Sequence, residues 1–122
     1  MQATGNSLLL DLYDCTSPAL NSPDMLEQLF MDALQFAGFD MVEHLSHQFP
    51  IQGTTFITIL RQSHAALHTW PENGFVSVDV YSCGAPAAVR AALDIFRERL
   101  TQSLAARTSN ARFIERGLVT TS

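Results

Sequence analysis

The sequence predicts an α+β fold: a two-layer sandwich in which an antiparallel sheet carries two helices on one face. Several short apolar or alternating segments are separated by turn residues, as expected for hairpins. Two longer segments repeat their apolar residues at helical spacing. The chain has 122 residues and 47% hydrophobic content, enough for one core. The expected order is β-α-β-β-β-α-β, in a single domain spanning residues 1–122.

The first elements are a buried strand and a helix. Residues 7–13, SLLLDLY, form an apolar run that ends at turn-forming residues. Ser22, Pro23 and Asp24 then combine an N-cap, a proline suited to the first helical turn and an acid that favours a helix N-terminus. Gly38 is the expected end of this helix.

The remaining strands surround a second helix. Residues 40–49 and 54–62 are expected to form two strands around a turn. Residues 74–82 alternate, with three valines on one side. A helix is expected from Pro86, with Val89, Leu93, Phe96 and Leu100 on one side, and residues 111–116 are the last expected strand.

The composition of the chain argues against several classes of function. The net charge of −5 argues against a nucleic-acid partner. No apolar run is long enough for a membrane span, and the first residues lack a basic signal-peptide region, so a soluble, cytoplasmic protein is expected. The chain contains no lysine. This absence excludes a lysine Schiff base, as in pyridoxal phosphate enzymes, and a P-loop.

Two histidines stand four residues apart. His64 and His68 could bind a metal if the segment were a helix and if His47, Glu72 or Cys83 supplied a third ligand. The HExxH pattern is absent, and Thr69-Trp70-Pro71 makes a poor helix. We therefore expect no metal, and His64 is expected to be structural.

Cys83, Trp70 and Glu72 can each be interpreted in two ways. Both cysteines are expected to be free thiols. Cys83 ends a strand just before a helix N-terminus, which favours a poised thiol, although a small buried side chain is the alternative. Cys15 is expected to serve packing. Trp70 belongs to the core or stacks on a planar ligand near a rim, and Glu72 is solvated or accepts hydrogen bonds from sugar hydroxyls.

Ser63 gives no familiar signal alone, because no G-x-S-x-G elbow surrounds it. The sequence around Ser63 is more informative. Residues 63–84, SHAALHTWPENGFVSVDVYSCG, resemble the signature ESHxxxHTWPExGxxxxDxxxCG of the small bacterial and archaeal S-adenosylmethionine decarboxylases. LLLDLYDC at 8–15 resembles that family's LLLDLYGC, and HQFPIQGTT at 47–55 resembles its H-x-F-S-P-Q-G-V-S. The resemblance covers most of residues 5–100.

The resemblance implies a proenzyme that cleaves itself between Gln62 and Ser63. The serine oxygen attacks the preceding carbonyl, and β-elimination followed by hydrolysis leaves a pyruvoyl group derived from Ser63. The substrate amine would form a Schiff base with this ketone, which fits the missing lysine. The product, decarboxylated S-adenosylmethionine, supplies spermidine biosynthesis. The family's sites lie at a homodimer interface and use residues of both subunits.

The resemblance also implies roles for single residues. His68 would act as acid or base in processing, helped by the hydroxyl of Thr55, which stands where the family has serine. Cys83 would return a proton to the substrate's α-carbon.

Substrate-binding residues follow from the same resemblance. Phe49 and Trp70 would sandwich the adenine, and Glu72 would hold the ribose hydroxyls. Together these three residues favour a nucleoside substrate.

The sequence also departs from the family pattern. Gln62 replaces the usual glutamate before the scissile bond, and further departures occur at Ser7, Pro50-Ile51, Ala65 and Asn73. One alternative is therefore a pyruvoyl decarboxylase of arginine or ornithine. The other is an uncleaved, non-catalytic homologue; Gln62 favours it, whereas intact Ser63, His68 and Cys83 argue against it.

Overall fold

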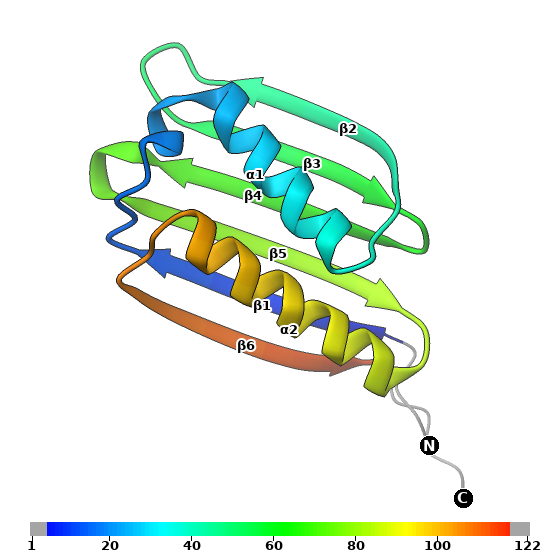
Figure 1. The fold of residues 1–122 in the computed structure, drawn as a ribbon. Coiled ribbons are helices and arrows are strands. Elements are labelled where there is room, and N and C mark those ends of the chain that lie inside the picture. Colours follow the sequence, from blue (N-terminus) through cyan, green and yellow to red (C-terminus); the bar gives the residue numbers. More distant parts are fainter. Residues whose placement is uncertain (1–4, 118–122) are drawn as a thin grey trace, which may run out of the picture.

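One antiparallel sheet with two helices across one face makes up the protein (Figure 1). The computed structural model describes residues 5–117. The strand order within these residues is β2-β3-β4-β5-β1-β6. The elements are β1 (Gly5–Tyr13), η1 (Pro18–Asn21), α1 (Pro23–Phe36), β2 (Met41–Gln48), β3 (Thr54–Leu60), β4 (Ser63–Trp70), η2 (Pro71–Asn73), β5 (Phe75–Cys83), α2 (Pro86–Ser103) and β6 (Thr108–Arg116).

The predicted α+β class is confirmed, but the predicted element order lacked one strand. Residues 63–70 form β4, which pairs with β3 on one side and β5 on the other. Its alternation buries Ala65, Leu67 and Thr69. Alanine and leucine favour helix locally, and pairing with both neighbours overrides that preference.

The capping signals act as predicted. The Ser22 hydroxyl accepts a hydrogen bond from the Met25 N–H at 3.4 Å, and Pro23 opens α1. Gly38 follows the end of the helix with a φ of 92°, a left-handed conformation that glycine adopts without strain.

The core lies between the helices and the sheet. α1 covers β2, β3 and β4, and α2 covers β5, β1 and β6 (Figure 1). Phe30 of α1 sits at the centre, with its ring 5.6 Å from that of Phe56 and 6.1 Å from that of Phe96. All three side chains are fully buried. Neither helix has the length and apolarity needed to cross a membrane, among the residues described.

The opposite face of the sheet carries several exposed apolar side chains, and no helix formed by residues 5–117 covers it. We call it the open face. Among its side chains are Leu45, Ile57, Ile59 and Ile114, all of them exposed large hydrophobic residues. Ile59 is 48% exposed and Leu45 67%. Grouped apolar side chains of this kind usually mark a surface that another molecule covers.

Candidate functional site

The predicted site residues fall into two groups at opposite ends of β4. Ser63 is the first residue of this strand and His68 is the sixth. A strand rises about 3.3 Å per residue, so the two Cα atoms are roughly 16 Å apart. In Figure 1 the β3–β4 turn and the end of β5 lie at one edge of the molecule, and the β4–β5 connection lies at the other. One chain therefore does not bring all the predicted residues together.

The first group surrounds the bond between Gln62 and Ser63, at the turn that joins β3 to β4. The Ser63 hydroxyl donates a hydrogen bond to the Arg61 carbonyl at 3.0 Å. The Gln62 carbonyl accepts one from the backbone N–H of Cys83 at 3.3 Å. A donor at a carbonyl oxygen withdraws electrons from its carbon and stabilises negative charge on that oxygen. The Gln62 carbonyl is thus polarised beside a serine hydroxyl.

The backbone at Gln62 is also strained. Its φ is 62°, in the left-handed region that residues other than glycine, asparagine and aspartate seldom adopt. This conformation costs roughly 1–2 kcal/mol for an ordinary L-residue. The two-residue turn between the paired residues Leu60 and Ser63 requires it. Strain is therefore stored at the residue before Ser63.

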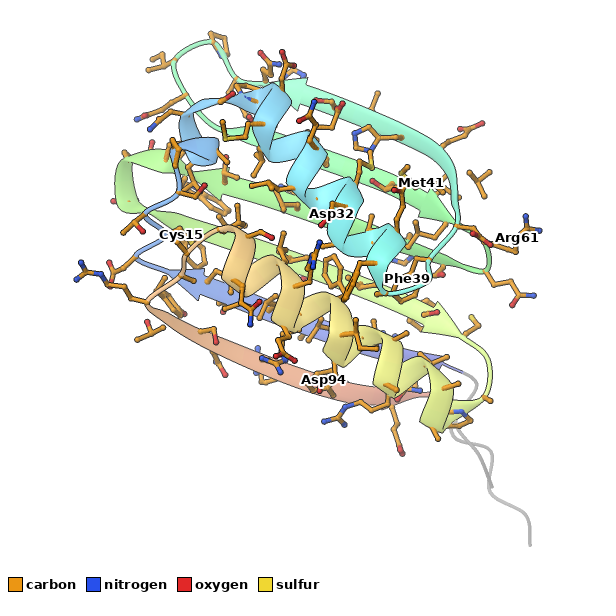
Figure 2. The ribbon with its side chains drawn as sticks, in the orientation of Figure 1. Cys15, Asp32, Phe39, Met41, Arg61 and Asp94 are labelled. Carbon is orange, nitrogen blue, oxygen red and sulfur yellow. The ribbon has the colours of Figure 1, made fainter. Side chains whose placement is uncertain are left out.

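Cys83 belongs to this group. It ends β5, and it lines the same hollow of about 330 Å³ as Ser63 and Gly84. Phe39 and Arg61 also line this hollow, and Figure 2 labels both at this end of the sheet.

Cys15 lies far from this end, near the opposite edge of the sheet (Figure 2). Both cysteines are free, as predicted. Burial raises the pKa of the Cys15 thiol to about 11, and the neighbouring Asp14 charge adds to the shift. Cys15 is therefore a neutral packing residue at ordinary pH.

The second group gathers at the other end of β4. His68 faces Thr55 across the β3–β4 pair, and the Thr55 hydroxyl lies 2.9 Å from His68 Nδ1 in a hydrogen bond. Both side chains line a hollow of about 430 Å³ that Phe49, Trp70 and Glu72 also line. Within one chain, Thr55 and His68 therefore lie in the same hollow as the three residues to which the resemblance assigns substrate binding.

Two aromatic rings form walls of this hollow. Phe49 is 49% exposed and Trp70 is 42% exposed, so each has a free surface for a planar ligand. Trp70 is supported by Phe75, with ring centroids 5.3 Å apart. Glu72 follows within η2, on the same rim.

The loop carrying Phe49 is fixed by two hydrogen bonds that backbone N–H groups donate. The Phe49 N–H donates to the Gly53 carbonyl at 3.0 Å, and the Thr54 N–H donates to the Thr69 hydroxyl at 3.0 Å. Gly53 has a φ of 103°, and a Cβ there would lie 3.2 Å from the Thr69 carbonyl. The geometry of this wall therefore depends on glycine.

His64 stays apart from both groups. Its ring stacks on Tyr81, with the centroids 5.8 Å apart. Within residues 5–117, no three histidine, cysteine, aspartate or glutamate side chains gather as a metal site would need. His64 and His68 lie on a strand and not on one helical turn, so they do not have the spacing that the metal alternative required.

A second histidine, His44, also makes side-chain contacts, which the sequence did not predict. His44 Nδ1 lies 2.8 Å from the Thr58 hydroxyl, and its Nε2 lies 3.1 Å from Glu27. Thr58 is fully buried, so its hydroxyl is inaccessible to a substrate. This chain of contacts ties α1 to β2 and β3.

Comparison with known proteins assigns the chain to a family. The sequence profile of the S-adenosylmethionine decarboxylase family matches residues 6–117. The chain belongs to this family. The match spans both groups of site residues and all the strands and helices described above except the first residue of β1.

Individual relatives support the same assignment. An S-adenosylmethionine decarboxylase proenzyme of Prochlorococcus marinus is 36% identical over 96 residues, covering 79% of this chain and 77% of its own. One of Bacillus cytotoxicus is 34% identical over 117 residues, covering 96% and 87%. The crystal structure of the adenosylmethionine decarboxylase from Aquifex aeolicus superposes with a TM-score of 0.82 at 28% identity, covering 100% and 98%.

The two thiols are expected to differ in reactivity. With its pKa raised to about 11, Cys15 holds roughly one thiolate per thousand molecules at pH 8. Iodoacetamide at pH 8 should alkylate Cys83 in the native protein and leave Cys15 unlabelled until the pH approaches 11, as read by peptide mass spectrometry. Urea-unfolded protein, the control, should be labelled at both. Equal labelling of the native thiols would contradict the assignment of Cys15 to packing.

Proposed function

We propose that this chain is a proenzyme that cleaves itself between Gln62 and Ser63 and then decarboxylates S-adenosylmethionine. The proposal is supported most directly by the Cys83 N–H held 3.3 Å from the Gln62 carbonyl oxygen, beside the Ser63 hydroxyl. Membership of the S-adenosylmethionine decarboxylase family supports the reaction. Relatives bearing the name proenzyme support the cleavage.

Cleavage starts with an acyl shift. The Ser63 oxygen attacks the Gln62 carbonyl carbon and loses its proton, and the negative charge that develops on the carbonyl oxygen is stabilised by the Cys83 N–H. The C–N bond then breaks as its nitrogen takes up a proton, leaving an ester between Gln62 and the Ser63 oxygen, with a free amine on residue 63. Relief of the left-handed backbone at Gln62 favours this step.

Elimination then separates the two chains. The Cα proton of residue 63 passes to a base, the Cβ–Oγ bond breaks, and Gln62 leaves as a carboxylate. The resulting dehydroalanine takes up water and releases ammonia to leave a ketone. This ketone supplies the carbonyl that condenses with a substrate amine and withdraws electrons as carbon dioxide is lost. It meets the need for an electrophile in a chain without lysine.

The residues present fit the substrate. A hollow of about 430 Å³ between Phe49 and Trp70 suits a nucleoside, and volumes of this order are typical of small-molecule sites. Adenine stacks between the two rings, and the Glu72 carboxylate accepts hydrogen bonds from the ribose hydroxyls. A pocket for arginine or ornithine alone would not need two exposed aromatic walls.

Each complete site needs two chains. Ser63 and Cys83 stand roughly 16 Å along the strand direction from His68, too far for one small substrate to contact both groups. A second copy packed on the open face, related by a two-fold axis perpendicular to the strands, would place its His68 at this chain's Ser63 end, on the face where alternation along β5 puts Cys83. Such a dimer covers the exposed Leu45, Ile57 and Ile59.

Within this arrangement His68, hydrogen-bonded to Thr55, serves as the acid or base of processing. Cys83 returns the proton to the substrate's α-carbon after carbon dioxide leaves. The protein acts as a homodimer of processed chains in the cytoplasm.

The Ser63 assignment has a direct test by intact mass. Denatured wild-type protein should give two chains of about half the length each, the second lacking a free amine. Ser63→Ala removes the attacking oxygen and should give one full-length mass. Normal cleavage of this variant would end the pyruvoyl assignment, and a single full-length wild-type mass after long incubation would support the uncleaved alternative.

Substrate choice is tested by carbon dioxide release from labelled substrates. Processed protein should release it from S-adenosylmethionine and not from arginine or ornithine. Trp70→Ala removes one stacking wall, worth about 1 kcal/mol or more, and should raise KM for S-adenosylmethionine at least several-fold. Release from arginine or ornithine alone would replace the proposed substrate.

Whether each site uses residues of two chains can be tested with a mixed dimer of two different variants. Cys83→Ala and Trp70→Ala should each be processed, and each should be weakly active when the substrate concentration is well below the wild-type KM. Co-expressed with different tags and purified as the mixed dimer, they should regain about half of wild-type activity, because one of the two shared sites then holds both intact residues. No recovery would mean that each site is built within one chain.

A further inference from the structure

A row of polar side chains leads from Ser63 across the sheet on the face that the helices cover. Ser63 of β4 is paired with Ser82 of β5, and Ser82 is paired with Asn6 of β1. Residues directly opposite in antiparallel strands point to the same side, with Cβ atoms about 5 Å apart. The three side chains therefore form one row, with Ser82 in the middle.

Two members of this row are buried. Asn6 is 4% exposed and Ser82 is 6% exposed. The Nδ2 atom of Asn6 has no hydrogen-bond partner among the described residues, and it is the one buried side-chain nitrogen or oxygen there with none. Glu115, its neighbour in β6, is exposed and does not supply one. A buried donor without a partner costs about 1–3 kcal/mol, and leucine would fill similar space without that cost.

We propose that Ser82 donates a hydrogen bond to the Ser63 oxygen during the elimination step, and that Asn6 positions the Ser82 hydroxyl for it. The inference rests on the proposed self-cleavage. A hydroxyl has one hydrogen and two lone pairs. When the Asn6 amide donates to the Ser82 oxygen, the Ser82 hydrogen is directed to the other neighbour in the row, residue 63.

The hydrogen bond from Ser82 would stabilise the charge that develops during the elimination. As the Cβ–Oγ bond of residue 63 breaks, that bond's electron pair moves onto Oγ, and Gln62 becomes a carboxylate. The Cα proton passes to the base proposed above, and a Cα–Cβ double bond forms. One carboxylate oxygen already faces the Cys83 N–H. Ser82 supplies the donor for the other, so adjacent residues of β5 stabilise both oxygens.

Ser82 thus contacts a reacting atom, whereas Asn6 is a positioning residue. In the uncut chain the Ser63 hydroxyl donates to the Arg61 carbonyl, so the row is not yet joined to it. The acyl shift removes the hydroxyl hydrogen, and the contact to Arg61 is then lost. The unpartnered Asn6 donor is consistent with a network that closes only during processing.

The test follows processing of the full-length chain by mass, with and without hydroxylamine. Hydroxylamine splits the ester and leaves a free serine at residue 63, so it reports an ester that has formed but not eliminated. Ser82→Ala should slow formation of the blocked second chain at least about tenfold, the low end expected for losing one donor to a developing charge. Hydroxylamine-cleavable ester should accumulate. Ser82→Thr keeps the hydroxyl and should stay within about twofold of wild type.

Asn6→Leu should change the same readouts in the same direction and leave the melting temperature unchanged or higher, because no hydrogen bond of the uncut fold is lost. Ser109→Ala, on exposed β6, is the matched control and should process normally. Unaltered processing of Ser82→Ala would overturn the inference, as would slowing without ester or slowing that Ser82→Thr does not rescue. Wild-type protein that neither cleaves nor reacts with hydroxylamine would instead refute the proposed self-cleavage.

Discussion

The register of β4 between β3 and β5 is the constraint on which the rest of the structure depends. Ala65, Leu67 and Thr69 face the helices because this register puts them there. Their alternate neighbours, His68 among them, are thereby presented on the open face. A slip of one residue would exchange the two sets, exposing Leu67 and burying the imidazole. Packing of the core and presentation of the site are consequences of one strand pairing.

The same register also brings the groups proposed for self-cleavage together at the first residue of β4. A two-residue turn forces Gln62 into a left-handed conformation and brings its carbonyl to the end of β5, where the Cys83 N–H meets it. Glutamine keeps the size of the family's usual glutamate and removes its charge. Because the contacts at this bond are made by backbone groups, they do not depend on that charge. This is the physical reason to expect cleavage despite the departure at Gln62.

In the proposed dimer, the open face brings the two groups of site residues together. This proposal needs a sheet face that helices leave uncovered, because a second copy must pack against it to bring a His68 group to a Ser63 group. Here the face that carries His68 is also the face with exposed Ile57 and Ile59. Burial of these apolar side chains would drive the association that completes the site. In that proposal, assembly and catalysis share one surface.

The sequence by itself determined the α+β class, the caps of α1, the free cysteines and the family signature around Ser63. Each depends on local pattern: apolar spacing, Ser22-Pro23-Asp24, or a run of specific residues. Only the tertiary structure decided that residues 63–70 are a strand, because Ala65 and Leu67 carry no local preference for one. It also decided that Thr55 meets His68, that Asn6 joins the row of Ser63, and that Ser63 and His68 lie apart. Those relations are set by register between strands distant in sequence, which no local pattern encodes.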